Sequence, residues 1–302
     1  MFARPYPRAA AAVAALLLAS CAMPPPASGP AGPPAPQAHV DVGLAAQAGA
    51  FEAFTRKAGA ISPAFSGVED VSRGLQAGAA YEPRQLEAGM IAYAALAALQ
   101  EPAFVAGVKK AGGRGLARRL AANPEAAFDL PGAAAAAGRA NGALHRRGEA
   151  LVDAGGRVRK AAYSVQKHKW STARLTNGPA RLAQVKRIST GGHRAAPEDR
   201  ARVAAAVAEG GRRGGASPVV ARGLALAALT VLGQEAQGRS LLSEPRTGAC
   251  LRWAKMNFHQ CLASAGTHYE DIYCLGVHAM TETGQCVVEA TRPARIRRAA
   301  VG

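Results

Sequence analysis

Residues 83–99 read PRQLEAGMIAYAALAAL and predict a helix. Proline suits the first turn of a helix, where the N–H that it lacks would have no intrahelical partner, and Pro83 stands at that position. Apolar residues then recur at steps of three and four, as on one face of a helix, at Leu86, Met90, Tyr93, Ala94 and Ala97. The alternation of apolar and polar residues that is typical of a strand is missing here.

The same helical period recurs along most of the chain. Helices are predicted in residues 44–58, 66–80, 102–108, 157–170, 179–188, 197–208 and 218–232. Glycines and prolines predict several shorter pieces between residues 111 and 156, and a glycine-rich loop at residues 210–215. The prolines that begin these helices are unevenly spaced, which argues against a solenoid with a fixed repeat. We therefore expect an all-α fold with an irregular multi-helix domain.

Composition and charge limit the kinds of core and partner. Of the 302 residues, 49% are hydrophobic but only 5% are aromatic, so the core must consist mainly of alanine, leucine and valine. The formal net charge of +17 favours anionic partners such as lipid head groups, lipopolysaccharide phosphates or wall polymers. High alanine, arginine and glycine content is also typical of a genome rich in G and C, and this remains the alternative origin of the charge.

The first twenty residues have the pattern of a signal peptide. Arg4 and Arg8 precede an apolar stretch at residues 9–19. That stretch is shorter than the about 20 apolar residues that a membrane-spanning helix needs. It ends in Leu18-Ala19-Ser20-Cys21, which resembles the lipobox of bacterial lipoproteins.

The lipobox resemblance implies an export route and an anchor. Cleavage would make Cys21 the first residue of the mature chain, and its thiol would carry lipid, including palmitate, in sufficient amount for stable membrane anchoring. Ala22 follows instead of aspartate, which implies sorting to the outer membrane with the protein facing the periplasm. An ordinary secretory signal with a chance cysteine is the alternative.

The resulting organisation has five parts. Residues 1–20 are the predicted signal peptide, and residues 21–40 are the lipidated cysteine with a linker rich in proline and alanine, which is expected to form an extended spacer. A helical domain is predicted at residues 41–245 and a two-disulfide helical hairpin at residues 246–290. A basic tail follows at residues 291–302.

Four further cysteines predict two nested disulfides. Two helices, 251–265 and 269–283, are predicted on either side of a turn at Gly266. Cysteines eleven residues apart lie about 16 Å apart along a helix, which excludes a disulfide within one helix. The hairpin therefore pairs Cys261 with Cys274 near the turn and Cys250 with Cys286 at the open end.

The two cysteine spacings differ by one residue. Cys286 lies twelve positions after Cys274, and on a continuous α-helix that step overshoots the face of Cys274 by about 120°. We therefore expect Gly284 to end the second helix before Cys286. The hairpin resembles the twin-cysteine helical hairpins of intermembrane-space proteins in architecture only. A structural zinc site is the alternative, but these spacings lack its usual close ligand pairs, so no metal is predicted.

Sequence motifs for catalysis are lacking, and neither a catalytic residue nor a cofactor is predicted. On a continuous helix His268, Asp271 and His278 would share one face, as a metal or acid–base site requires, although a run such as His268-Tyr269-Glu270-Asp271 is more often a helix start. The adjacent acid pairs have the same two interpretations; they are Glu69 with Asp70, Glu198 with Asp199, and Glu270 with Asp271.

A basic stretch supplies the candidate binding residues. On a helix through residues 157–170, basic side chains share one face and apolar ones another, while Tyr163 and Trp170 suit a head-group boundary. The residues predicted to bind an anionic surface are Arg157, Lys160, Lys167, Lys169 and Trp170. The alternative is a solvated helix that packs its apolar side on the core.

These observations predict a membrane-anchored periplasmic lipoprotein of the outer membrane. We expect a non-catalytic structural or binding component of the cell envelope, held on the membrane by its lipid. Its expected partner is an anionic envelope polymer or another envelope protein, and nucleic acid is not expected. The alternative is a periplasmic hydrolase of cell wall or glycan whose acid pair the sequence does not locate.

Overall fold

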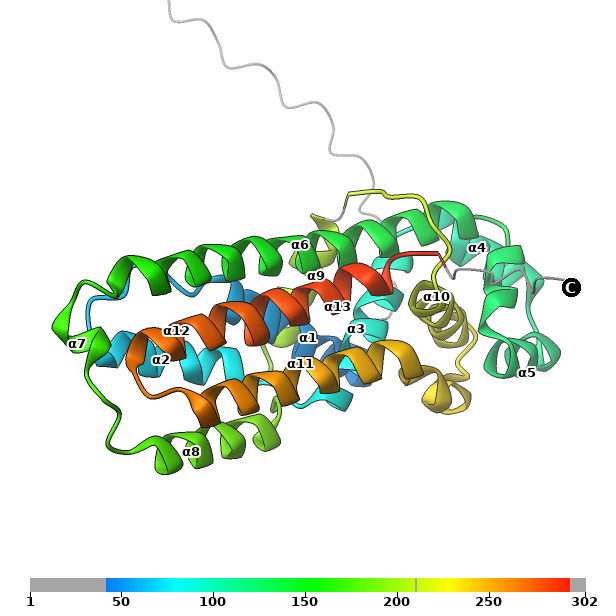
Figure 1. Ribbon diagram of the computed structural model, residues 1–302. Coiled ribbons are helices and arrows are strands. Elements are labelled where there is room, and N and C mark those ends of the chain that lie inside the picture. The colour runs from blue at the N-terminus through cyan, green and yellow to red at the C-terminus, as the bar shows by residue number, and fades with distance from the viewer. Residues whose placement is uncertain (1–41, 210, 294–302) are drawn as a thin grey trace, which may run out of the picture. The chain divides into compact units, whose positions relative to one another are not determined.

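The computed structural model describes residues 42–209 and 211–293, and this part of the chain is helical (Figure 1). It contains no strand, and its one β-bridge joins Arg174 to Thr267. The all-α prediction is therefore confirmed. The predicted signal peptide, Cys21, the linker and the tail beyond residue 293 lie outside the described residues.

The helices follow one another with short connections. In chain order they are α1 Val42–Gly59, α2 Val68–Ala79, α3 Pro83–Ala98, α4 Pro102–Ala111, α5 Arg114–Ala122, η1 Pro124–Asp129, α6 Ala133–Val165, α7 Lys169–Thr172, α8 Gly178–Gly191, α9 Asp199–Ala208, α10 Pro218–Val231, η2 Glu235–Leu242, α11 Pro245–Ser264, α12 His268–Cys274, η3 Leu275–Glu282 and α13 Thr283–Ala290. The segments η1 and η2 are 3₁₀ helices, and η3 is a π-helix.

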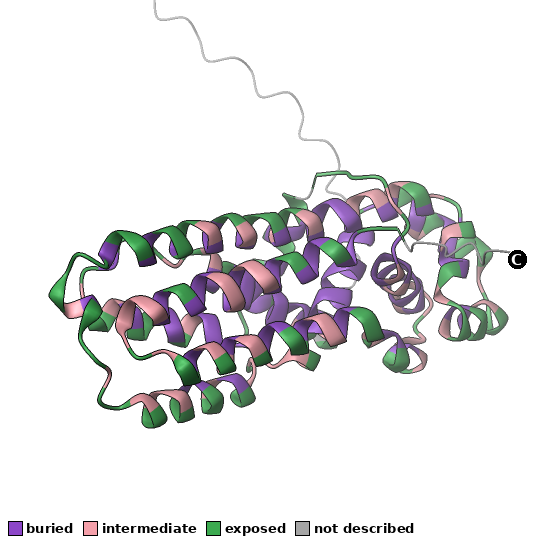
Figure 2. Cartoon of the chain, viewed as in Figure 1, coloured by how far each residue is buried: buried purple, intermediate pink, exposed green. Residues whose placement is uncertain are grey.

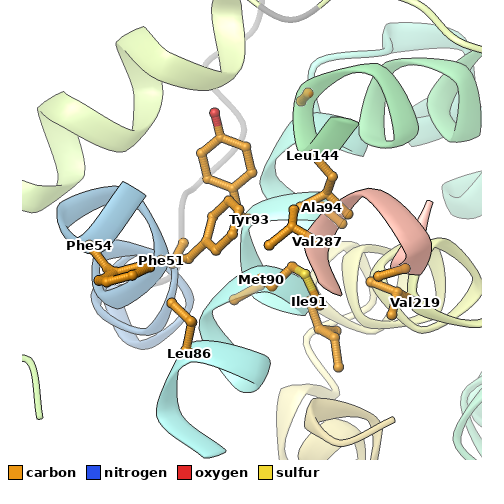
Figure 3. Close-up of a cluster of buried hydrophobic side chains, with 14 of the residues drawn as sticks. Phe51, Phe54, Leu86, Met90, Ile91, Tyr93, Ala94, Leu144, Val219 and Val287 are labelled. Carbon is orange, nitrogen blue, oxygen red and sulfur yellow. The ribbon is translucent and has the colours of Figure 1, made fainter. Parts of the chain in front are cut away.

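Helix α3 is the centre of the domain. All its residues from 89 to 98 are buried, as expected for a helix that is apolar on every side. Helices α1, α6 and α10 pack around it. Phe51 of α1 packs against Tyr93 of α3, and their ring centroids are 5.1 Å apart. Figure 3 shows that other helices add side chains to the same cluster, among them Leu144, Val219 and Val287. Exposed residues lie on the outer faces of the helices (Figure 2).

Helix α6 differs from the prediction at both ends. Its 33 residues form one helix from Ala133 to Val165, where a helix was predicted only from residue 157. Two glycines within it lie at helix contacts, Gly148 against Gly284 and Gly155 against Gly276, and their packing overrides their weak helix propensity. The predicted helix 157–170 is also wrong at its end, because the chain turns after Val165 and restarts as α7.

The C-terminal hairpin has the predicted disulfides. Helix α11 forms one arm, and α12, η3 and α13 form the other, which packs along α6 (Figure 1). Cys250 is bonded to Cys286 with a Cα–Cα distance of 5.7 Å, and Cys261 to Cys274 with 5.6 Å. The nested pairing is confirmed.

The expected helix end at Gly284 is wrong. The second arm continues through Gly284 to Ala290, and the π-helix η3 lies between Cys274 and Cys286. A π-helical turn has hydrogen bonds from i to i+5 and takes up additional residues compared with an α-turn. Twelve residues in this arm therefore return to the face that eleven reach in α11. The glycine contacts show the same difference of one residue between a regular α-helix and this arm. Gly148 and Gly155 of α6 are seven residues apart, whereas their partners Gly284 and Gly276 are eight apart.

Among the described helices, no single one is long and apolar enough to cross a membrane. Helices α3 and α4 reach that length and hydropathy together, but they meet at an angle of 94°.

Candidate functional site: a basic groove beside the end of α6

Three of the predicted binding residues line one surface hollow of about 490 Å³. It lies between the last turns of α6 and the connection from α1 to α2, at the end of the bundle where α7 is labelled in Figure 1. We call it the basic groove; its lining residues are Pro63, Ala64, Phe65, Arg157, Lys160, Ala161, Ser164, Val165, Lys167 and His168.

The local sequence explains the layout of the groove. Residues 157, 160, 161, 164 and 165 follow the three- and four-residue steps of one helix face. Ala161, Val165 and Phe65 are buried and belong to the hydrophobic core, so they give the groove an apolar floor. The exposed basic side chains stand above this floor, and the turn after Val165 adds Lys167 and His168.

The basic side chains of the groove have no counter-charge. No carboxylate lines the hollow, and Arg157, Lys160 and Lys167 make no side-chain hydrogen bond or ion pair with any described residue. Some arginines elsewhere are paired, since Glu101 accepts hydrogen bonds from Arg139 at 2.7 Å and from Arg212 at 2.8 Å. The groove is therefore a surface where an external anion meets unpaired cations.

The other two predicted binding residues lie outside the groove lining. Lys169 and Trp170 belong to α7, and Trp170 is half-buried against the hydrophobic core, with its ring stacked on His168 at a centroid distance of 6.4 Å. Tyr163 is exposed, and its ring contacts that of Tyr273 at 6.1 Å. The tyrosine and the tryptophan thus belong to two separate helices, α6 and α7, and not to one continuous helix as predicted.

The adjacent acid pairs have partners within the fold. Asp70 accepts hydrogen bonds from Ser66 and contacts Arg73. Asp199 is buried and accepts hydrogen bonds from the Ala196 N–H at 2.8 Å and from His193 Nε2 at 2.7 Å. Burial alone would raise the pKa of Asp199, but these two donors outweigh it and the pKa is lowered.

The predicted cluster of His268, Asp271 and His278 is not formed. Asp271 is buried in an ion pair with Arg181, and burial raises the pKa of Asp271 to about 7 in spite of that partner. His278 Nδ1 instead lies 2.8 Å from Glu282 Oε1, one turn along its own helix. In the described part of the chain, no three residues of the types His, Cys, Asp and Glu are arranged to hold a metal ion.

Carboxylates do gather in a different hollow of about 500 Å³, which we call the glutamate hollow. Glu149, Glu282 and Glu289 line it, beside the Cys250–Cys286 disulfide and Trp253, whose surface is 62% exposed. Glu282 is bound by Asn257 at 3.0 Å and by His278, and Glu289 is paired with Arg292 at 2.6 Å.

Sequence reasoning missed both the opposite wall of the groove and the glutamate hollow. Residues 63–65 lie far from α6 in the chain, and no local pattern indicates that they meet it. The glutamates come from α6 and from the π-helical arm, whose register the sequence did not predict. No family model matches this chain, and no curated protein or solved structure matches it significantly.

Proposed function

We propose that this chain is a lipid-anchored outer-membrane protein, facing the periplasm, whose helical domain binds phosphate groups of an anionic envelope polymer in the basic groove. In this proposal it is a binding protein and not an enzyme. The lipobox-like Leu18-Ala19-Ser20-Cys21 supports the anchor, and two disulfides suit an oxidising compartment.

One observation carries the binding part of the proposal. Arg157, Lys160 and Lys167 line a single hollow, none has an ion-pair partner in the described structure, and no carboxylate lies in the lining. Each cation near an anionic surface contributes about 1 kcal/mol to binding. Three together are enough for an affinity that depends strongly on salt concentration.

The binding test uses purified lipopolysaccharide and its dephosphorylated form as probes. The variant R157Q/K160Q/K167Q should bind intact lipopolysaccharide at least about tenfold more weakly than the wild type, because about 1.4 kcal/mol corresponds to tenfold. The matched control is K109Q/K110Q/R114Q, which removes the same charge from exposed residues around the end of α4 and the start of α5, in the other half of the bundle (Figure 1).

The control should retain wild-type affinity within a factor of two to three. Equal loss in both variants would show that only net charge matters and would contradict a binding groove. Equal binding of intact and dephosphorylated lipopolysaccharide by the wild type would contradict phosphate recognition.

The anchor has its own test. In cells supplied with labelled palmitate, the wild type should carry label on the peptide that begins at Cys21, and the variant C21A should leave the membrane fraction. A native protein with an unmodified residue 21 would contradict the lipoprotein proposal, whatever the groove binds.

The glutamate hollow is the observation that favours a hydrolase of wall or glycan. Three carboxylates and an exposed tryptophan, which suits stacking on a sugar, line the same hollow. Glu282 and Glu289 already have protein partners, so the binding function is better supported. Release of soluble sugar from purified wall by the wild type, abolished in E282Q, would reverse this order.

A further inference from the structure

A third hollow, of about 460 Å³, lies between α8 and α11, and Pro83 of α3 is also part of its lining. We call it the lysine pocket. Its basic lining residues are Lys186, Arg252, Lys255 and His259, and its main apolar ones are Leu182 and Met256. No carboxylate lines this pocket.

Lys255 is the unusual residue of the pocket because it is only 6% exposed and makes no ion pair with an acidic side chain in the described part of the chain. Its Nζ lies 3.0 Å from the carbonyl oxygen of Ala79, 3.2 Å from Ser189 Oγ and 3.4 Å from the centroid of the Tyr81 ring. All three groups are neutral. A buried ammonium without a counter-charge is costly, and burial lowers the pKa of Lys255 well below its usual value.

Other charged groups around Lys255 do not supply the missing counter-charge. Lys186 from α8 and Arg252 from α11 are cationic, and neither makes an ion pair within the described residues. Glu82 is the one carboxylate that raises the pKa of Lys255, but it accepts a hydrogen bond from the Gln85 N–H at 2.8 Å and caps α3. The pocket therefore has an excess of positive charge.

The pKa of His259 responds to that positive charge. Its Nε2 lies 3.2 Å from Ser189 Oγ, which is also within 3.2 Å of Lys255 Nζ. Burial, together with the charges of Lys255 and Lys186, lowers the pKa of His259 to about 4. An anion in the pocket would oppose the effect of these cations and raise the pKa of His259 again.

We propose that the lysine pocket binds an amphiphile with one acidic head group, a phosphate monoester or a carboxylate, with its head near Lys255, Lys186 and Arg252. The head supplies the counter-charge that the pocket lacks, and Leu182 and Met256 give the chain an apolar wall. The volume lies within the range of about 300 to 1,000 Å³ that is typical of small-molecule sites. This site differs from the basic groove in the elements that form it and in its ligand.

The test follows His259 in the full chain, held in phosphatidylcholine nanodiscs and labelled with carbon-13 at histidine. Octyl phosphate is the probe with both head and chain, inorganic phosphate has the head alone, and octanol has the chain alone. Octyl phosphate should raise the pKa of His259 by about one unit or more. Inorganic phosphate should do the same only at a concentration at least tenfold higher, and octanol should not change it.

Octanoate at pH 7 distinguishes the two possible heads. Whichever of octanoate and octyl phosphate binds more tightly identifies the ligand class, and either result supports the proposal. An unchanged His259 signal with both at millimolar concentration would overturn the proposal, and so would an equal response to octanol.

Two variants separate this pocket from general charge effects. K255M keeps an apolar stem without the charge and should weaken octyl phosphate binding at least tenfold. K186Q changes an exposed residue that the fold does not need, and it should weaken binding several-fold. K109Q and the groove variant R157Q/K160Q/K167Q should bind octyl phosphate as the wild type does. Wild-type affinity in both K255M and K186Q would overturn the proposal.

Discussion

Gly276 of the π-helix η3 packs directly on the backbone of α6 at Gly155. A Cβ atom at Gly276 would lie 2.5 Å from the backbone nitrogen of Arg159 and 2.9 Å from the carbonyl oxygen of Gly155. Real Cβ contacts essentially never fall below 3.0 Å. The two helices therefore touch backbone to backbone, and only glycine fits at this contact.

The first prediction concerns this contact. G276A should lower the free energy of unfolding by about 1 to 3 kcal/mol, because the added methyl group forces α6 and η3 apart. The matched control is G156A, whose added Cβ meets nothing within 4 Å. It should raise stability slightly, by up to about 1 kcal/mol, because alanine is the better helix former. Urea unfolding measures both, and equal stability of the two variants would contradict the close approach.

The second prediction tests the role of the π-helix as a register correction. Deleting Thr281 from η3 leaves Cys274 and Cys286 eleven positions apart, the same separation as between Cys250 and Cys261 in the opposite arm. The segment should then close as a regular α-helix and keep both disulfides. Deleting Met256 from α11 leaves Cys250 and Cys261 ten positions apart, and the Cys250–Cys286 bridge should be lost. Peptide mapping without reduction identifies the bridges, and loss of a bridge in the Thr281 deletion would contradict this explanation.

The third prediction concerns the stability that the two disulfides provide. The Cys250–Cys286 bridge closes a loop of 36 residues and the Cys261–Cys274 bridge one of 13. Loop-closure entropy then predicts a loss of about 4 kcal/mol for C250S/C286S and about 3 kcal/mol for C261S/C274S. Urea unfolding of the oxidised proteins measures these losses. A reducing agent should destabilise the wild type but leave the variant with all four serines unchanged.

The fourth prediction concerns pH and Asp199. The lowered pKa of Asp199 means that the folded state favours its carboxylate form, so this stabilisation is present above about pH 4 and is lost as pH falls through the folded-state pKa. D199N keeps the shape without the charge. It should be about 1 to 3 kcal/mol less stable than the wild type at pH 7, and this difference should shrink at pH 3.

The neighbouring acid is the control for that experiment. Glu198 is exposed and pairs with Arg202 at 3.3 Å, so E198Q should change stability by less than about 0.5 kcal/mol at pH 7. A difference between D199N and the wild type that does not vary between pH 7 and pH 3 would contradict the titration of Asp199.

The spacing of apolar residues was sufficient to predict a helix wherever the face that it buries is the apolar face of its own sequence. The apolar steps at Leu86, Met90 and Tyr93 correctly predict α3, and helix geometry alone predicts which cysteines pair. Those steps alone do not show that α3 is central; its burial on all sides agrees instead with the absence of charged residues between residues 88 and 98.

Tertiary packing explains what the sequence did not predict. The sequence predicted a helix only from residue 157, but α6 begins at Ala133 and runs through Gly148 and Gly155, each of which fits against the opposite arm. Cys274 and Cys286 are one position further apart than Cys250 and Cys261. This additional residue is compatible with either a helix end or a widened π-helical turn, and only the contact with α6 shows which of the two occurs. The wall of the basic groove at residues 63–65 depends on a contact distant in sequence, which no local pattern records.

The nested disulfides also affect the order of events during biogenesis. Along the export route proposed above, the four cysteines remain thiols in the cytosol, where glutathione and thioredoxin prevent cross-linking. The newly made chain then lacks both loop closures and is several kcal/mol less stable than the mature protein. On that proposed route such a precursor would be easier to keep unfolded for threading through a translocation channel, and oxidation on the far side would add the stability of both loop closures.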